Sequence, residues 1–282
     1  MDLRTYLSEY HIDLCGVLPL DACTILRPHL LQRGGFSKED KLYVQLFAIP
    51  YLSRAAEQPD RNVSAYAVGR DYHLFVKTLL DELLPRLHRD HPNHRFAGFA
   101  DHSPIDEIDA AVKAGLGIRG RNHLLLTERY SSYVFLAEIV TDLPLTPTPT
   151  ALPPELQTCH DCGRCSSACP MTHDGGECRS ALTQKKQPLT DIEIEQLLSH
   201  PIVWGCDICQ EVCPYTAHAK ARGTIWTPIS FFNQQTIPHL TLEVLDAMSD
   251  EQFAERAYAW RGRPTIRRNL SLRRSSRKEK EN

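Results

Sequence analysis

Two cysteine-rich stretches decide the fold of this 282-residue chain: CHDCGRCSSACP at residues 159–170 and GCDICQEVCP at residues 205–214. The first has the spacing C-x2-C-x2-C-x3-C-P, and the second repeats the last three cysteines of that pattern. Three cysteines on such a loop bind three irons of a [4Fe–4S] cube, and the fourth serves a second cube. This spacing is that of bacterial ferredoxins and predicts two [4Fe–4S] clusters.

Eight of the ten cysteines lie in this region and supply the eight ligands that two clusters need. The missing first cysteine of the second stretch is Cys178, displaced upstream by an insertion. Structural zinc also uses CxxC pairs, but it needs neither the third cysteine nor the following proline. Cys15 and Cys23 are expected to be small buried hydrophobes. We assign Cys159, Cys162, Cys165 and Cys213 to the first cluster, and Cys178, Cys206, Cys209 and Cys169 to the second.

The composition, 42% hydrophobic and 24% charged, is that of an ordinary globular protein and excludes disordered, collagen-like and coiled-coil chains. No apolar run approaches the ~20 residues of a membrane helix. The N-terminus lacks the basic flank and apolar stretch of a secretion signal. We therefore expect a cytoplasmic chain without membrane contact. A reducing cytosol disfavours disulfides, which again favours metal ligation by the cysteine cluster.

Residues 1–145, upstream of the cysteines, have the pattern of a mixed α/β domain. Residues 71–88 predict a helix with one apolar face, which Pro85 kinks or ends early. A second helix is predicted at residues 106–114, ending at Gly115. Five prolines within residues 143–154 predict an extended linker. Compact apolar runs predict strands at residues 43–49, 96–100, 124–126 and 133–140.

The C-terminal segment is basic, whereas the rest of the chain is acidic. Residues 261–282 hold nine Lys or Arg and two Glu, a charge of +7, which leaves −10 on residues 1–260. Such a tail suits a polyanion such as nucleic acid. The alternatives are a solvated, partly disordered end and arginines that pack on the acidic body.

Several stretches that occur in a fixed order carry a resemblance to a known family. Together they resemble the epoxyqueuosine reductases, cobalamin-dependent iron–sulfur enzymes related to the reductive dehalogenases. The stretches are SAYAVGRDYH (64–73), ADHSPIDE (100–107), AGLGIRGRN (114–122), SSYVFLAEIVTDL (131–143), the first cysteine run, CRSALTQ (178–184), GCDICQEVCP (205–214) and, weakly, WRGRPTIRRNLSL (260–272).

The resemblance implies an α+β fold with consecutive parts. A cobalamin-binding catalytic domain, with a nitroreductase-like sheet and flanking helices, occupies residues 1–145. A proline-rich linker follows at residues 146–156 and a ferredoxin-like double [4Fe–4S] domain at residues 157–220. A helical segment with the basic tail, residues 221–282, ends the chain.

The resemblance also implies an activity. The family removes the epoxide oxygen of epoxyqueuosine at the wobble position of a tRNA anticodon and produces queuosine. Cob(II)alamin and the two clusters are the implied cofactors, with electrons from an external donor such as flavodoxin or ferredoxin. The implied partner is the tRNA anticodon stem-loop, bound by a monomer.

Asp101 matches the catalytic acid of the family. Opening an epoxide leaves negative charge on oxygen, so a proton donor is needed, and burial would raise the pKa of a carboxyl group toward neutral pH. The alternative is an aspartate at the end of a strand or one that caps a helix, since Ser103 and Pro104 follow. The resemblance implies cobalamin contacts at Ser64, Asp101, Leu125, Leu136, Ile139 and Asp207, and we expect tRNA contacts at Arg261, Arg263, Arg267 and Arg268.

Some features depart from the family pattern or suggest other functions. Ile118 and Arg121 replace the usual aromatic residue and lysine, and SALT replaces SYLT after Cys178, so a related reductase of another substrate is an alternative. Another is a two-cluster electron carrier without a corrin. GLGIRG at residues 115–120 fits a dinucleotide fingerprint, with Glu138 as the acid, but a helix-like stretch precedes it. We expect a loop for His88, His91 and His94, and burial for Trp204, Trp226 and Trp260.

Overall fold

The computed structural model describes residues 3–37, 39–148, 158–159, 162–171 and 178–281, and of residues 277–281 it describes the backbone alone. The chain divides into two compact units, each assembled from separate segments. These units interleave along the sequence, whereas the predicted domains are consecutive. The first comprises Met1–Pro50, His73–Cys162 and Tyr215–Ile229, and the second Tyr51–Tyr72, Gly163–Pro214 and Ser230–Asn282.

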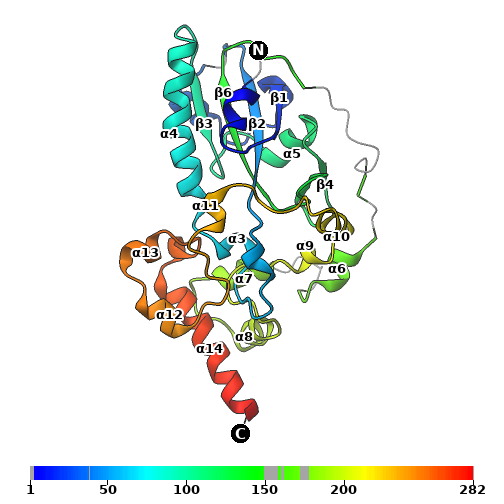
Figure 1. The fold of residues 1–282 in the computed structure, drawn as a ribbon, viewed down its shortest axis with the longest axis vertical. Coiled ribbons are helices and arrows are strands. Elements are labelled where there is room, and N and C mark those ends of the chain that lie inside the picture. Colours follow the sequence, from blue (N-terminus) through cyan, green and yellow to red (C-terminus); the bar gives the residue numbers. More distant parts are fainter. Residues whose placement is uncertain (1–2, 38, 149–157, 160–161, 172–177, 282) are drawn as a thin grey trace. The chain divides into compact units, whose positions relative to one another are not determined.

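An antiparallel sheet forms the centre of the first unit (Figure 1). Its strand order is β1-β2-β6-β3. The two central strands run through mostly apolar sequence. β2 is buried on both faces after its first residue, as its apolar run predicts, whereas the first three residues of β6 are only partly buried. The strands are β1 (Leu14–Pro19), β2 (Tyr43–Pro50), β3 (Phe96–Phe99) and β6 (Val134–Thr141).

Helix α5 (Glu107–Lys113) covers one face of the sheet. Val44 and Leu46 of β2, which alternate with residues of the other face, pack with Ala110 and Ala111 of this helix. Asp106 caps the helix by accepting a hydrogen bond from the Asp109 backbone N–H at 3.0 Å. This face therefore carries the side chains of the even-numbered residues of β2.

Helix α4 (Tyr72–Asp90) covers the opposite face (Figure 1). The Phe96 ring lies edge-on to His88, with 5.3 Å between ring centroids, and Gly98 leaves room for Leu80. The helix continues through Pro85 to Asp90, so the expectation of an early end was wrong, and so was the loop predicted at His88, whose Nδ1 lies 2.8 Å from the Leu84 carbonyl oxygen.

A small hairpin follows α5 and accounts for the glycine-rich stretch. It consists of β4 (Ile118–Arg119) and β5 (Leu125–Leu126). Gly115 has a φ of +75°, and a Cβ at Gly117 would collide with the Leu126 carbonyl oxygen. The glycines thus serve this unit's own packing, and no strand–turn–helix of a dinucleotide site is formed. The remaining elements of the unit are α1 (Arg4–Ser8), η1 (Leu20–Ala22), α2 (Pro28–Arg33) and α10 (Pro214–Ala221).

The proline-rich stretch is described only at its start. Thr148 bonds to β1, with its hydroxyl 2.8 Å from the Val17 backbone nitrogen and its own backbone N–H donating to the Val17 carbonyl. Residues 149–157, most of the predicted linker, lie outside the described residues.

Short helices build the second unit around the long helix α14 (Arg263–Glu281). Ile266 and Leu270 form its buried side, and it packs against α7, α8 and α12. Trp204 is fully buried beside Tyr258, as expected. The other elements are η2 (Arg54–Glu57), α3 (Ala65–Val68), α6 (Arg164–Ala168), α7 (Arg179–Gln184), α8 (Asp191–Leu198), α9 (Ile208–Glu211), α11 (Ser230–Asn233), α12 (Leu242–Ala247), α13 (Asp250–Ala254) and η4 (Ala259–Arg261).

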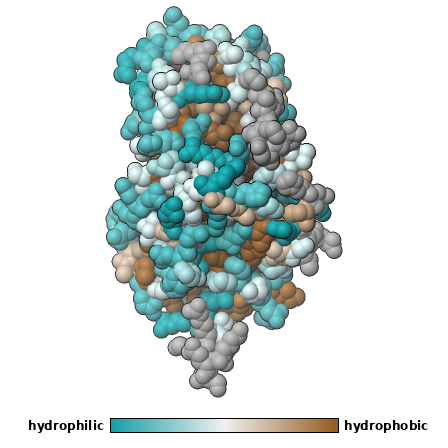
Figure 2. Space-filling model, turned by 45° about the vertical axis from the view of Figure 1, so that its right-hand side comes forward, coloured by the Kyte–Doolittle hydropathy of each residue, from teal (hydrophilic) through white to brown (hydrophobic). Residues whose placement is uncertain are grey.

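The surface shown in Figure 2 is mostly hydrophilic, with scattered hydrophobic patches. Within the described part of the chain, each helix is too short or too polar to cross a bilayer. Cys15 and Cys23 are buried in the first unit, as expected for small hydrophobes.

Candidate functional site

Asp101 lies in a tight loop directly after β3. Its φ of +60° is in the left-handed region, which aspartate tolerates better than most residues. Its side chain is 72% exposed, and the carboxylate lies 3.7 Å from Nε2 of His73. The expectation that Asp101 is buried was therefore wrong. It is not a helix cap either, because Asp106 caps α5.

The segment that follows Asp101 is fixed to the body of the first unit. The buried Ser103 hydroxyl donates to Glu138 and accepts from the Ile105 backbone N–H. Nη1 of Arg27 donates to the Ser103 carbonyl at 2.9 Å, and the Arg27 backbone N–H donates to the Pro104 carbonyl at 3.0 Å. Asp101 thus projects into solvent from a loop whose following residues are held in place by hydrogen bonds.

Two carboxyl groups lie together beneath this loop. Glu138, on the α5 face of β6, is fully buried, and Glu107 is the first residue of α5. Each has one oxygen atom, Oε1 of Glu107 and Oε2 of Glu138, that is buried and finds no hydrogen-bonding partner among the described residues. Two facing carboxylates need a proton between them to form a hydrogen bond.

The environment of this carboxyl pair favours its protonated form. Burial raises the pKa of Glu107 to about 7, and the negative charge of Asp101 acts in the same direction. Burial, together with the charge of Glu107, also raises the pKa of Glu138 well above its usual range. The pair therefore holds a proton near neutral pH, directly below the Asp101 loop.

The predicted cluster ligands are all free thiols in the structure. In the second unit, four of them come from three separate segments. Burial raises the pKa of Cys209 to about 12, and the neighbouring thiols of Cys206, Cys178 and Cys165 contribute to this increase. These four sulfur atoms are thus close enough to affect one another. Soft sulfur donors of this kind suit iron–sulfur clusters. The described residues, however, contain no group of three or more His, Cys, Asp or Glu side chains already placed to hold one metal ion, so the cluster assignment rests on the cysteine spacing.

Comparison with known proteins decides the family. A family model described as "Epoxyqueuosine reductase QueG, DUF1730" matches residues 43–102. An epoxyqueuosine reductase of Listeria monocytogenes is 30% identical over 96% of this chain and 79% of its own length. The chain belongs to the epoxyqueuosine reductase family. A second such reductase, from Cyclobacterium marinum, is 34% identical over 68% of this chain and 60% of its own length.

A solved epoxyqueuosine reductase shares the fold of this family member. Its crystal structure, described as a complex with an epoxyqueuosine-modified tRNA stem loop, matches with a TM-score of 0.70 and 23% identity. The match covers 95% of this chain and 80% of the solved one.

Two residues that the family resemblance marked as cobalamin contacts, Ser64 and Asp207, meet in the second unit. The Ser64 hydroxyl donates to Oδ1 of Asp207 at 2.5 Å. Oδ2 of the same carboxylate accepts from Nη1 of Arg61 at 2.7 Å and from the Ala65 backbone N–H at 2.8 Å. Asp207, which is 1% exposed, therefore joins the start of α3 to the second cysteine stretch.

The apolar residues predicted to contact cobalamin lie in the first unit, and the structure does not bring all of them together. Leu125 is buried in the core on the α5 face, where the partly exposed Leu136 packs against it. Ile139 is fully buried, and its odd number places it on the α4 face of the sheet. Of the predicted contacts, Asp101 is exposed and Leu136 is partly exposed, and the others are buried.

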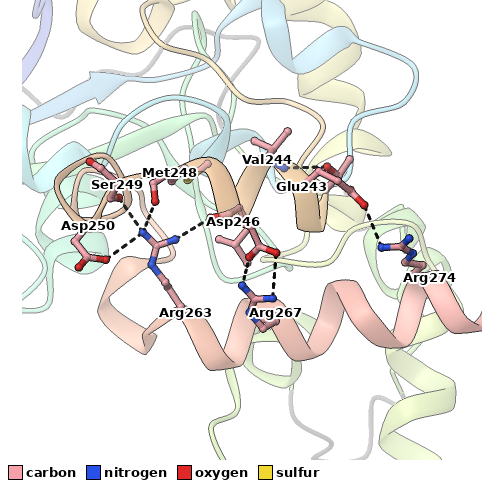
Figure 3. Close-up of polar contacts among 11 residues, drawn as sticks. Glu243, Val244, Asp246, Met248, Ser249, Asp250, Arg263, Arg267 and Arg274 are labelled. Atoms are coloured by element: carbon pink, nitrogen blue, oxygen red, sulfur yellow. Dashed lines mark hydrogen bonds and ion pairs between the residues drawn. The ribbon is translucent and has the colours of Figure 1, made fainter.

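The four arginines predicted to contact tRNA all interact with the protein itself. Arg263 donates to the Leu245, Met248 and Ser249 carbonyls, and Arg267 forms an ion pair with Asp246 (Figure 3). Arg268 donates to the Gln187 carbonyl at 2.9 Å, and Arg261 stacks 3.8 Å from the centre of the Trp260 ring. Trp260 is 57% exposed, so the expectation of its burial was wrong.

Sequence reasoning missed the carboxyl pair and its anchor, Ser103. Sequence reasoning treats Glu138 only as the acid of a dinucleotide fingerprint, although it lies inside the apolar strand predicted at residues 133–140. That position was itself the signal, because an inward-facing acid in a buried strand requires a partner. Glu107 lies in the same family stretch as Asp101 but was not singled out.

Proposed function

We propose that this chain reduces the epoxide of epoxyqueuosine in tRNA to give queuosine. The observation that carries this proposal is the alignment with the Listeria monocytogenes reductase, at 30% identity over 96% of the chain. The related enzyme solved with an epoxyqueuosine-modified tRNA stem loop supports tRNA as the substrate. Reduction consumes two electrons and two protons, breaks both C–O bonds of the epoxide and releases its oxygen as water.

In this proposal Asp101 donates a proton to the departing oxygen. Its carboxyl group is exposed, and the segment that follows it is fixed by hydrogen bonds. Both properties suit a residue that meets a large substrate from solution. His73, at 3.7 Å, holds the carboxylate before the substrate arrives. The Glu107–Glu138 pair keeps a proton in reserve beneath the loop.

We propose two [4Fe–4S] clusters and cobalamin as cofactors. Cobalamin would bind to a nitroreductase-like part of the chain and the clusters to a ferredoxin-like part. Bound cobalamin supplies the reducing cobalt centre, and one-electron chemistry requires a donor such as flavodoxin or ferredoxin. The accessible, apolar Leu136 fits direct contact with a corrin face, with Leu125 packed behind it. The buried Ser64–Asp207 pair stabilises the segment around Cys206 and Cys209.

For tRNA binding we propose the exposed Trp260 with Arg261 stacked on its ring, because an accessible aromatic ring beside a cation suits a nucleotide base. Direct contacts of Arg263, Arg267 and Arg268 with tRNA stay a prediction. We propose that the protein acts as a monomer in the cytoplasm.

The test is conversion of epoxyqueuosine in tRNA by the purified chain, reconstituted without oxygen with iron, sulfide and cobalamin. Mass analysis of the tRNA nucleosides after addition of a one-electron donor should show queuosine, with one oxygen atom fewer than its precursor. Protein without cobalamin is the control. An unchanged nucleoside profile from fully loaded protein would overturn the proposal.

A further inference from the structure

Arg179 places a buried positive charge beside the predicted ligands of the second cluster. It directly follows Cys178 in the chain and begins α7. Its side chain is completely buried. Placing a charged group in a protein interior costs several kcal/mol unless nearby groups stabilise it. The partners of this guanidinium therefore indicate its function.

Only one nitrogen of the Arg179 guanidinium has conventional acceptors. Nη2 donates to the carbonyl groups of Leu197, His200 and Ile202, at 2.8 to 3.0 Å. Nε and Nη1 are buried and find no acceptor of their own among the described residues. One side of the guanidinium is thus held, and the other still has N–H groups to donate.

The groups that stabilise this charge are sulfur atoms. The Arg179 guanidinium interacts with the side chain of Cys206 and, less strongly, with that of Cys178, the residue that precedes it in the chain. Within the described part of the chain, no carboxylate takes this role. Burial and the charges of Arg179 and Arg273 lower the pKa of the nearby His200 to about 4, so this histidine adds no second charge at neutral pH.

The guanidinium is also fixed in position. Arg273 of α14 donates to the Leu198 carbonyl at 2.9 Å and to the His200 carbonyl, so it anchors the same end of α8. Asn269 joins the end of α7 to the segment that follows α8, through the carbonyl groups of Thr183 and Val203. The unsatisfied N–H groups of Arg179 therefore have a defined direction.

We propose that Arg179 is the counter-ion of the second [4Fe–4S] cluster and donates hydrogen bonds from Nε and Nη1 to its sulfur atoms. This inference rests on the proposed assignment of Cys178 and Cys206 to that cluster. A cluster held by four thiolates is already an anion, and each electron that it accepts adds one negative charge. A fixed cation and N–H···S bonds stabilise the reduced state, so Arg179 raises the reduction potential of this cluster.

The first experiment measures reduction potentials of the reconstituted protein by redox titration followed by electron paramagnetic resonance. Arg179→Gln should lower the potential of one cluster and leave the other nearly unchanged. Arg273→Gln is the matched control, because it removes a charge and carbonyl contacts at the same helix end. Equal shifts in both variants, or no shift in Arg179→Gln, would overturn the proposal.

The second experiment does not require the uncharged variant Arg179→Gln to fold. Wild-type protein, labelled with nitrogen-15 in its arginines only, should show hyperfine coupling between a reduced cluster and an arginine nitrogen. The coupling should be lost in Arg179→Lys. Iron and sulfide analysis of the same samples tests the cluster assignment separately. Loaded wild-type protein without this coupling, or a lysine variant that retains it, would refute the role of Arg179 alone.

Discussion

Asp101 is the residue on which the proposed chemistry depends most directly. We expect Asp101→Asn to retain the iron, sulfide and cobalamin content of the wild type, because the amide is nearly isosteric and the side chain is exposed. Turnover should fall by about 10²–10⁴-fold, the usual cost of losing a general acid. Single-turnover conversion of modified tRNA measures this. Near-normal rates would assign proton donation to another group.

The Glu107–Glu138 pair predicts a pH dependence of stability. Burial raises the pKa of Glu107 in the folded state to about 7 from 4.5, so the native protein binds more protons than the unfolded chain between these values. The contribution of Glu107 to the free energy of unfolding should therefore fall by about 3 kcal/mol as the pH rises through this window, and Glu138, whose pKa burial also raises, should add to the decline.

Glu107→Gln should remove the part of this decline that Glu107 contributes. Urea unfolding at about pH 5 and about pH 8 measures the decline. The exposed Glu39→Gln is the matched control and should retain the wild-type difference. A decline of the same size in Glu107→Gln would mean that Glu107 holds no extra proton in the folded protein.

Among the secondary-structure elements, α14 corrects the picture of a solvated basic tail. Arg267 and Arg268 hold it to Asp246 of α12 and to the Gln187 carbonyl. Replacing both by Ala should lower the thermal unfolding midpoint. A double-mutant cycle between Arg267 and Asp246, both about half exposed, should give a coupling of only ~0.2–1 kcal/mol.

Comparing the arginine double variant with a variant of Trp260 separates stability from tRNA binding. Trp260→Ala should weaken tRNA binding without lowering the unfolding midpoint, because its ring is largely exposed. If the arginine pair bound phosphate instead, its replacement would flatten the salt dependence of tRNA affinity by about one unit per lost contact. Measuring affinity against salt concentration distinguishes the two roles.

The sequence predicted those elements that its local patterns determine. Apolar runs identified β2, β3 and β6, and the cysteine spacing identified the candidate metal ligands. The strand β1 was missed, because Gly16 and Pro19 weaken its pattern and its pairing with β2 is a tertiary effect. Asp101 was identified through the family resemblance. The Glu107–Glu138 pair depends on α5 folding over β6, which local sequence does not reveal.

At the scale of the whole molecule, the clearest prediction is its metal content. We expect about eight irons and about eight sulfides per chain after reconstitution without oxygen, because eight cysteines follow the crossed spacing. Cys213→Ser should damage the first cluster, although the other ligands of that cluster lie about fifty residues upstream. Iron and acid-labile sulfide analysis measures this. Two tightly bound zinc ions without sulfide would contradict it.

The interleaved units also bear on how the chain is synthesised. The first unit takes its last segment from Tyr215–Ile229, and the second takes its first from Tyr51–Tyr72. On the ribosome, neither unit can therefore be completed before most of the chain has emerged, and early segments must wait for distant partners. A fragment that stops at residue 162 should lack cooperative unfolding, which circular dichroism can test, and nascent chains of this protein should depend on chaperones longer than those built from consecutive domains.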